Sequence, residues 1–169
     1  MNTPHRKVVT ELPHKIDEAL TSLYGDGHSR DTIIYCDDEP CIAKLMTEVL
    51  SLLFNKNVLA YPSAVHALKA ISIKESLRSK IALIVSDYDM PEKTGFSFAN
   101  ELRRNPELKD VPFLLTSGNV GLAQNCQLLE SLETGSIDGF MPKPTRMSEI
   151  PDVTISAINV RIKKLTTIN

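Results

Sequence analysis

The stretch IALIVSD at residues 81–87 decides the fold class of this chain of 169 residues. It begins as a continuous apolar run and closes in the polar pair Ser86 and Asp87. Strands that are apolar on both faces belong to parallel sheets that helices cover on both sides. The stretch therefore predicts a central strand of a parallel sheet, with polar side chains at the point where the strand ends.

Shorter strands and helices alternate around this central strand. Apolar runs predict further strands at residues 33–36, 58–61, 111–115 and 139–141. Helical spacing of apolar residues predicts helices at residues 42–53, from residue 63 toward 77, at 95–104, at 122–132 and from about 151 to 165. Strands that alternate with helices form right-handed βαβ units. The chain therefore predicts an α/β fold, a doubly wound five-stranded parallel sheet with helices on both faces.

Several side chains give detail to these helices. Ser63 is the expected N-cap of the second helix, and Gly135 is the expected C-cap of the helix at 122–132. The basic residues that end the last helix are interpreted as complements to the negative end of its dipole, and they are Arg161, Lys163 and Lys164. The buried face of the first helix is predicted to consist of Ile42, Leu45, Met46, Val49, Leu50 and Leu53.

Composition excludes several classes of function. The chain has 19 Lys and Arg against 21 Asp and Glu, for a formal net charge of −2, so no positive field draws it onto nucleic acid or an anionic membrane. No apolar stretch approaches the roughly 20 residues that span a bilayer. Cys36, Cys41 and Cys126 form no CxxC motif and are interpreted as reduced thiols. We therefore expect a cytoplasmic protein.

The first 31 residues precede the alternating pattern. Ile16, Ala19, Leu20 and Leu23 recur at helical spacing and predict a short amphipathic helix, which Gly25 ends. We expect this helix to be ordered and to cover apolar surface, and the alternatives are a role in forming a homodimer or disorder in solution. The expected division is an N-terminal extension at residues 1–31 and one domain at residues 32–169.

Acidic side chains follow two of the predicted strands. Asp37 and Asp38 come directly after the strand at 33–36, and Asp87 and Asp89 close the central strand. In an open doubly wound sheet, ligands bind beyond the carboxyl ends of the strands, so these carboxylates converge if the two strands are neighbours. Like charges at short distance need a cation, and an all-oxygen site with open positions suits Mg²⁺.

A hydroxyl and an ammonium group complete the same edge. Thr116 and Ser117 follow the strand at 111–115, and Lys143 follows the strand at 139–141. A metal, an ammonium and neutral donors together suit a phosphoryl group with negative charge on three oxygens. A carboxylate is then the nucleophile, and Asp87 is the choice because it lies on the most buried strand.

Four short motifs together resemble those of a known family. They are DDEP at residues 37–40, DYDMP at 87–91 with Gly95, TS at 116–117 and KP at 143–144. In this order, each at the end of a separate strand, they resemble the receiver domain of two-component response regulators. The resemblance covers the chain from Thr32 to Leu165. It implies a flavodoxin-like sheet with the strand order 2-1-3-4-5, an order that comes from the family and not from the residues.

The resemblance also implies roles for single residues. Asp87 would accept a phosphoryl group from a histidine kinase or a histidine phosphotransfer protein. Mg²⁺ would be bound by Asp38, by Asp87 and by the backbone carbonyl of Asp89, while Asp37 would act through a water molecule. These residues form the expected metal site.

A second set of residues would respond to the phosphoryl group. Thr116 would hydrogen-bond to it and Lys143 would pair with it. Phe140 matches the aromatic switch position of the family, and it lacks the hydroxyl of the commoner tyrosine. The peptide bond between Lys143 and Pro144 is expected to be cis.

The expected function is that of a stand-alone phosphorylation switch, not of an enzyme that turns over an external substrate. The face made by its fourth helix, fifth strand and fifth helix would bind a downstream protein target whose identity the sequence leaves open. The alternative is a phosphatase of the haloacid dehalogenase type that uses Asp87 and Asp89 as nucleophile and acid/base. In that family the Asp-x-Asp pair closes the first strand, whereas here it closes the third.

Overall fold

The structure is a computed structural model that describes residues 4–119, 121–122 and 125–167, with the backbone alone for residues 4–11. The strands are β1 (Thr32–Cys36), β2 (Asn57–Tyr61), β3 (Ile81–Asp87), β4 (Phe113–Ser117) and β5 (Gly139–Pro142). The helices are α1 (Pro4–Tyr24), α2 (Pro40–Phe54), α3 (Ala64–Ile73), α4 (Glu75–Arg78), α5 (Gly95–Arg103), α6 (Cys126–Thr134) and α7 (Ile150–Thr167).

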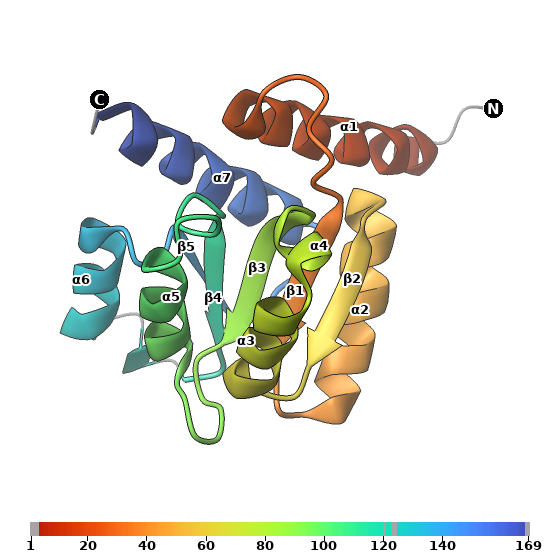
Figure 1. Ribbon diagram of the computed structural model, residues 1–169. Coiled ribbons are helices and arrows are strands. Elements are labelled where there is room, and N and C mark those ends of the chain that lie inside the picture. Colours follow the sequence, from red (N-terminus) through yellow and green to blue (C-terminus); the bar gives the residue numbers. More distant parts are fainter. Residues whose placement is uncertain (1–3, 120, 123–124, 168–169) are drawn as a thin grey trace.

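The strands form one parallel sheet in the order β2-β1-β3-β4-β5, as the sequence and the resemblance together predict. Helices α2 and α7 cover one face of the sheet, and α3, α5 and α6 cover the other (Figure 1). Two apolar clusters fill the two spaces between sheet and helices. The central strand β3 is buried along its whole length, which explains why its sequence is apolar on both faces.

Two predicted boundaries are wrong by a few residues. Strand β4 begins at Phe113, not at residue 111, because the N–H of Val111 donates to the carbonyl of Leu108 in a turn and Pro112 has no N–H to donate. Helix α6 begins at Cys126, not at residue 122, because the side chain of Asn125 accepts a hydrogen bond from the N–H of Gln127 and caps the helix.

Both predicted caps are present. The hydroxyl of Ser63 accepts from the N–H of His66 at the start of α3, and Gly135 ends α6 with a φ of 81°. The helix expected from residue 63 toward 77 is two helices, because Lys74 leaves the helical conformation between α3 and α4.

The predicted buried face of α2 is wrong at one position. The side chain of Leu45 is 55% exposed, whereas Val49, Leu50 and Phe54 are buried. Ala43 and Met46 in the first half of α2 pack against the apolar core cluster on this face of the sheet, but Leu45 is not part of that cluster. Leu45 instead lines a groove near the carboxyl ends of the strands.

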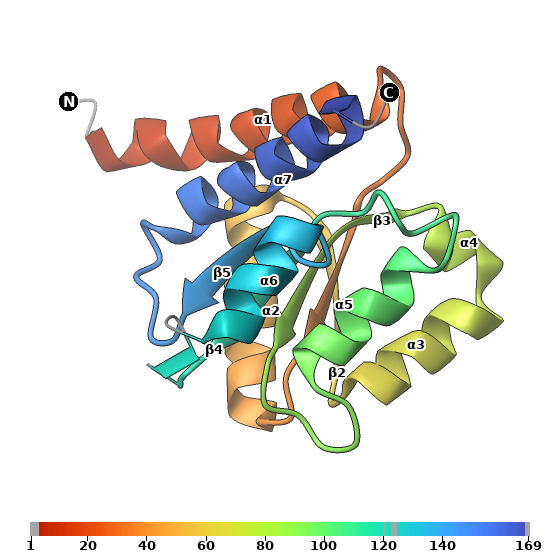
Figure 2. The same cartoon turned by 90° about the vertical axis from the view of Figure 1, so that its left-hand side faces the viewer.

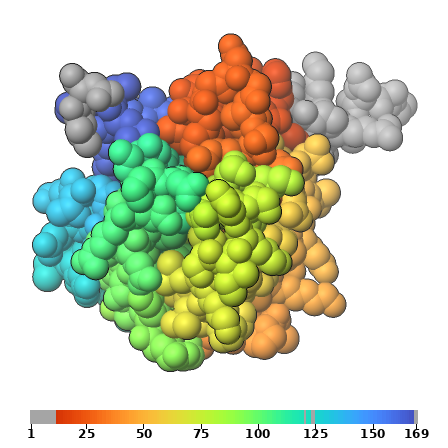
Figure 3. Space-filling view, in the orientation of Figure 1, coloured from red at the N-terminus to blue at the C-terminus, as the bar shows by residue number. Residues whose placement is uncertain are grey.

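The helix of the N-terminal segment is longer than expected, since α1 runs from Pro4 to Tyr24. Figures 1 and 2 both show it alongside α7, on the side of α7 away from the sheet. In the space-filling view, the part of α1 from residue 12 on lies directly against the rest of the molecule (Figure 3). Ile16, Ala19 and Leu20 are buried in the same apolar cluster as the core residues of α2 and α7. This helix therefore covers apolar surface, as its sequence predicts.

The packing of α1 gives a test of stability. Leu20 is 1% exposed, so Leu20→Ala is expected to lower the free energy of unfolding by about 2 to 5 kcal/mol, the usual result of deleting a buried leucine side chain. Urea unfolding followed by circular dichroism measures the change. Leu129→Ala removes the same atoms from a side chain that is 54% exposed, and it is the matched control. Equal effects of the two substitutions would contradict the docking of α1.

Candidate functional site

The residues predicted to form the site leave the sheet at one edge and on one face. Asp37 lies two residues after Tyr35, and Asp87 lies two residues after Val85, both of which face the α2 and α7 layer. Because side chains alternate along a strand, the two acids leave on that same face. Thr116 pairs with Asp87 in the register of β3 and β4, so its side chain lies beside that of Asp87.

Lys143 joins two of the acids. Its Nζ lies 2.6 Å from Oδ1 of Asp87 and 2.7 Å from Oδ2 of Asp37. The backbone N–H of Lys143 donates to the carbonyl of Ser117, and the peptide bond between Lys143 and Pro144 is cis, as the resemblance implies. The loop after β5 is thereby held against the end of β4, and the ammonium lies between the ends of β1 and β3.

Asp37 is held by three donors. Besides Lys143, the hydroxyl of Tyr35 donates to its Oδ2 over 2.9 Å, and the N–H of Glu39 donates to its Oδ1 over 3.1 Å. Tyr35 is fully buried, and the apolar pattern at residues 33–36 predicts only a strand residue at this position. The signal that identifies Tyr35 is its place two residues before Asp37, because residues at that spacing share a face of the sheet.

Burial and the ion pairs shift the pKa values of the site. Burial raises the pKa of Asp87, and the hydrogen bond and charge of Lys143 offset part of that rise. For Lys143, burial lowers the pKa, but the hydrogen bonds and charges of Asp37 and Asp87 outweigh it and raise the pKa above its ordinary value. Lys143 therefore stays charged, and Asp87 is the acid whose ionisation the site opposes.

Thr116 has a polar atom with no partner. Its side chain is 1% exposed, and its Oγ1 makes no hydrogen bond to any residue that the structure describes. A buried hydroxyl without a hydrogen bond costs on the order of 1 to 3 kcal/mol. The hydroxyl is therefore free to donate a hydrogen bond to an acceptor atom that binds next to Asp87.

The remaining expected metal ligands are solvent-exposed. Asp38 and Asp89 are both exposed, and no group of three or more His, Cys, Asp or Glu side chains gathers as a ligand cluster within residues 4–119, 121–122 and 125–167. Even so, the donors present are all oxygen, and one cation, the ammonium of Lys143, already lies against Asp37 and Asp87. This donor chemistry fits Mg²⁺.

Gly95 allows the close approach of α5 to the site. A Cβ atom at this position would lie 2.6 Å from the carbonyl oxygen of Asp87 and 2.4 Å from Cδ1 of Leu115. The N–H of Gly95 donates to the carbonyl of Tyr88, which fixes the loop after β3 against the start of α5. The glycine of the motif is therefore explained by packing against the backbone of Asp87.

The structure does not bring Phe140 to the strand-end cluster. Phe140 pairs with Leu115 in the register of β4 and β5, and it packs against the apolar cluster on the α5 and α6 side of the sheet. Thr116 pairs instead with Met141 and faces the α2 and α7 side. A structural change at the strand-end cluster can therefore reach Phe140 only through movement of β4 and β5.

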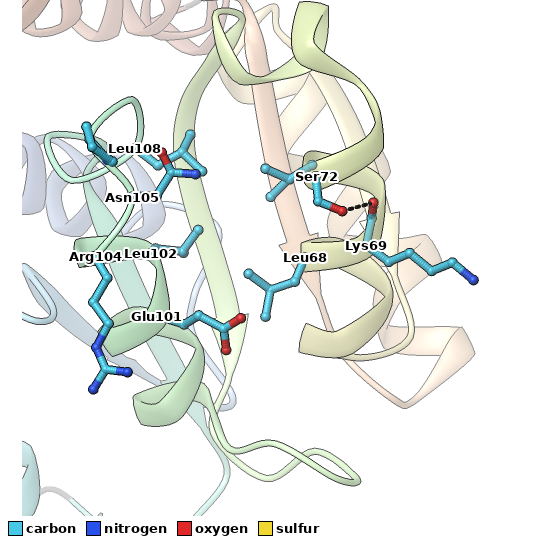
Figure 4. Close-up of a pocket in the computed structure, with 10 residues that line it drawn as sticks. Leu68, Lys69, Ser72, Glu101, Leu102, Arg104, Asn105 and Leu108 are labelled. Atoms are coloured by element: carbon cyan, nitrogen blue, oxygen red, sulfur yellow. Dashed lines mark hydrogen bonds between the residues drawn. The ribbon is translucent and has the colours of Figure 1, made fainter.

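Two cavities differ in their relation to this edge. One, with a volume of about 390 Å³, borders the site and has Thr116 and Lys143 in its lining beside apolar residues of α2. Another, of about 660 Å³, lies between α3 and α5, where Leu68 and Leu102 face each other (Figure 4). Its lining holds none of the strand-end acids, so the chemistry of the molecule is not located there.

Comparison with known protein families matches residues 33–154 to the response regulator receiver domain. The chain belongs to this family. Proteins of the family are signalling proteins of two-component systems and not classical enzymes, and the phosphatase alternative finds no support. None of the described helices has the length and apolar character needed to cross a membrane.

The similarity to this chain covers very different shares of two relatives. Two-component response regulator ARR17 of Arabidopsis thaliana is 26% identical over 153 residues, which cover 86% of this chain and 94% of ARR17. Chemotaxis protein CheV1 of Helicobacter pylori is 28% identical over 135 residues, which cover 80% of this chain and only 39% of CheV1. This chain therefore spans much less than the whole of CheV1.

A solved structure shows the same fold. The response regulator receiver domain protein from Clostridium thermocellum superimposes with a TM-score of 0.61 at 17% identity, over 82% of this chain and 98% of that chain. At this level of identity the likeness concerns the fold alone.

The raised pKa of Asp87 predicts a pH-dependent change of stability in Asp87→Asn. At neutral pH the folded wild type carries a charge that burial disfavours, so the amide variant is expected to have the higher free energy of unfolding. The difference arises as the pH rises from the ordinary carboxyl value of 3.8 to the raised pKa of the folded protein, and it is absent below 3.8, where both states are protonated. Urea unfolding over a range of pH measures it.

The control for this comparison is Asp26→Asn, which changes an exposed acid in the turn after α1. Its stability is expected to follow that of the wild type across the same pH range. A gain at neutral pH in Asp26→Asn equal to that in Asp87→Asn, or a loss in Asp87→Asn, would show that the charge of Asp87 does not oppose folding.

Proposed function

We propose that this receiver accepts a phosphoryl group on Asp87 and that phosphorylation changes the proteins that it binds. One observation carries the proposal. The buried carboxylate of Asp87 lies 2.6 Å from the ammonium of Lys143, beside the buried hydroxyl of Thr116, which lacks a partner in the described part of the chain. Membership of the receiver family supports the phosphoacceptor role.

In the transfer step, Asp87 is the group of this chain that forms a bond to phosphorus. An oxygen of Asp87 attacks the phosphorus atom of the donor, a phosphohistidine of a kinase or phosphotransfer protein or a small acyl phosphate. As the new O–P bond forms, the bond between phosphorus and the leaving group breaks, and the leaving group keeps the electron pair and takes up a proton when it needs one. The ammonium of Lys143 offsets the negative charge on the phosphoryl oxygens.

Mg²⁺ belongs to this proposal as the cofactor. Asp38 and Asp87 would hold it, together with the backbone carbonyl of Asp89, and Asp37 would act through a water molecule. When bound, the ion supplies positive charge at the phosphoryl oxygens.

The orphan hydroxyl supports a switching step. A phosphoryl oxygen on Asp87 is an acceptor for Thr116 Oγ1, so the side chain of Thr116 turns toward it. Movement of β4 at Thr116 passes to its neighbour Leu115 and from there to Phe140, its partner in the sheet register. The face that changes is formed by α6, β5 and α7, and a protein target docks there.

The wider setting is part of the same proposal. Residues 32–169 form the receiver and residues 1–31 an N-terminal extension, and the protein acts as a stand-alone switch in the cytoplasm. Its partners are a histidine kinase or a histidine phosphotransfer protein upstream and one protein target downstream, with a second copy of the chain as a further partner. Nucleic acid and membranes are not among the partners.

The first test is direct phosphorylation. Incubation with acetyl phosphate and Mg²⁺ is expected to add the mass of one phosphoryl group to the wild type, measured by intact-protein mass spectrometry. Asp87→Asn is expected to show no added mass, because the amide is not a nucleophile for phosphorus. Asp89→Asn keeps the backbone carbonyl at its position and is expected to accept the group.

Two outcomes would overturn the proposal. One is the absence of a mass shift in the wild type at saturating donor. The other is steady release of phosphate from a generic phosphomonoester over many turnovers, which is the behaviour of the alternative phosphatase and not of a stoichiometric phosphoacceptor.

The second test separates phosphorylation from switching. Thr116→Ala is expected to gain the phosphoryl mass but to lose the shifts of backbone amide resonances in α6 and β5 that phosphorylation causes in the wild type. Thr32→Ala is the control, because Thr32 is also a buried strand threonine but begins β1, at the end of the sheet opposite to Asp87. Nuclear magnetic resonance spectra of both variants with and without donor make the comparison.

Retention of the amide shifts in phosphorylated Thr116→Ala would show that the hydroxyl does not transmit the signal. Loss of the shifts in both variants would assign them to general loosening of the core.

A further inference from the structure

A second group of charged side chains lies at the opposite end of the sheet. Asp138 immediately precedes β5, and its side chain is completely buried. Arg103 of α5 lies 3.0 Å from one of its oxygens, and Arg161 of α7 lies 2.9 Å from the other. Lys164 of α7 lies 3.6 Å from Asp138 as well, so three cations surround one acid.

The sequence interpretation of these cations is wrong in part. Lys164 lies in the last turn of α7, as the dipole interpretation requires, but Arg161 lies before that turn. Both side chains also bind the neighbouring helix, because Lys164 donates to the carbonyls of Leu132 and Ile137, and Arg161 donates to the carbonyl of Gly135. They therefore bind the carboxyl end of α6 and the turn after it.

Not all donors of the cluster are used. Arg161 is 6% exposed at its side chain, and its Nε and Nη2 donate to Asp138 and Gly135. Its Nη1 makes no hydrogen bond to a residue in the described ranges, although Arg161 lines a cavity of about 550 Å³. A buried guanidinium thus has donors left over at a cavity wall.

The cavity has an excess of positive charge. Arg103, Arg161 and Lys109 line it, against one acid, Asp110. The side chains of Thr134 and Ser136 add hydroxyl groups to the same wall. Asp138, behind the wall, neutralises only one of the buried cations, so the lining favours a ligand with negative charge and several acceptor oxygens.

Burial shifts the pKa values of two of these cations. Burial and the neighbouring Arg161 together lower the pKa of Arg103 to about 10, against the opposite effect of Asp138. The pKa of Lys164 is also lowered, chiefly by burial, while Asp138 opposes the shift and Arg161 and Arg103 add to it.

We propose that this cavity is a binding site for a small phosphate-bearing molecule, with Arg161 Nη1 and Lys109 as donors to the phosphate. Arg103 adds positive charge, because its three guanidinium nitrogens already donate to backbone carbonyls and to Asp138. A volume of about 550 Å³ exceeds that of phosphate alone and falls in the usual range of small-molecule sites, so the ligand carries further atoms beside the phosphate. The site is independent of Asp87, because Asp138 lies at the start of β5 whereas Lys143 follows its end.

The test uses inorganic phosphate as the probe, added to the full chain without Mg²⁺ at constant ionic strength. Backbone amide resonances are followed by nuclear magnetic resonance. Saturable shifts are expected at residues 103–110, 134–138 and 161. Shifts confined to the surroundings of Asp87 and Lys143, or shifts that never saturate, would overturn the proposal. A phosphomonoester of a small polyol is expected to bind more tightly than phosphate, since it fills more of the cavity.

Two substitutions of residues that line the cavity are expected to change the phosphate affinity in opposite directions. Lys109→Glu is expected to weaken phosphate binding by about fivefold or more, because it reverses a charge close to the anion. Asp110→Asn is expected to tighten binding by about twofold or more, because it removes the one acid in the lining. The side chains of both residues lie outside the hydrogen bonds of the Asp138 cluster, so the fold is kept.

Lys163→Glu is the matched control. It makes the same charge change on the outer side of α7, where Lys163 is exposed and does not line the cavity. Its phosphate affinity is expected to stay within about twofold of the wild type, since the added charge is screened by solvent. Equal weakening by Lys163→Glu and Lys109→Glu, or no tightening by Asp110→Asn, would show that only the net charge of the protein matters.

Discussion

The contact of one ammonium with two buried carboxylates organises the functional edge of this receiver. Lys143 lies within 2.7 Å of both Asp37 and Asp87, which come from different strands, and the loop after β5 has to reach across the sheet to place it there. Two carboxylates at the edge of an apolar core are unfavourable without a cation, so the strands, the loop and the charges depend on one another. The same contact leaves Asp87 next to Thr116, whose hydroxyl has no partner within the described residues.

The two ends of the sheet differ in their ratio of buried acids to nearby cations. At the carboxyl end, two buried acids share one cation, and burial opposes the ionisation of Asp87. At the amino end, one buried acid, Asp138, lies among three cations, and burial lowers the pKa of Arg103. One end therefore has an excess of acid and the other an excess of base, a polarity that the net charge of −2 conceals.

Much of the fold was predictable because buried positions are apolar and recur in the sequence at the period of a helix or a strand. The apolar run of β3, the cap at Ser63 and the helix around Leu20 all follow from local spacing, and the structure contains them. The pattern fails where a residue has helical spacing but no neighbour to pack against. Leu45 is the example, because it lines a groove near the carboxyl ends of the strands and is 55% exposed, whereas Met46 beside it packs against the core.

The sequence by itself determined the α/β class, the strand-end position of Asp37, Asp87, Thr116 and Lys143, and the amphipathic character of α1, since each depends on residues close together in the chain. Only the tertiary structure decided that Lys143 pairs with both Asp37 and Asp87, that Phe140 lies on the opposite face from Thr116, and that Arg161 binds Asp138. The physical reason is that a hydrogen bond or ion pair between distant residues depends on register and helix orientation. Those are settled by packing of the whole sheet, and local spacing does not record them.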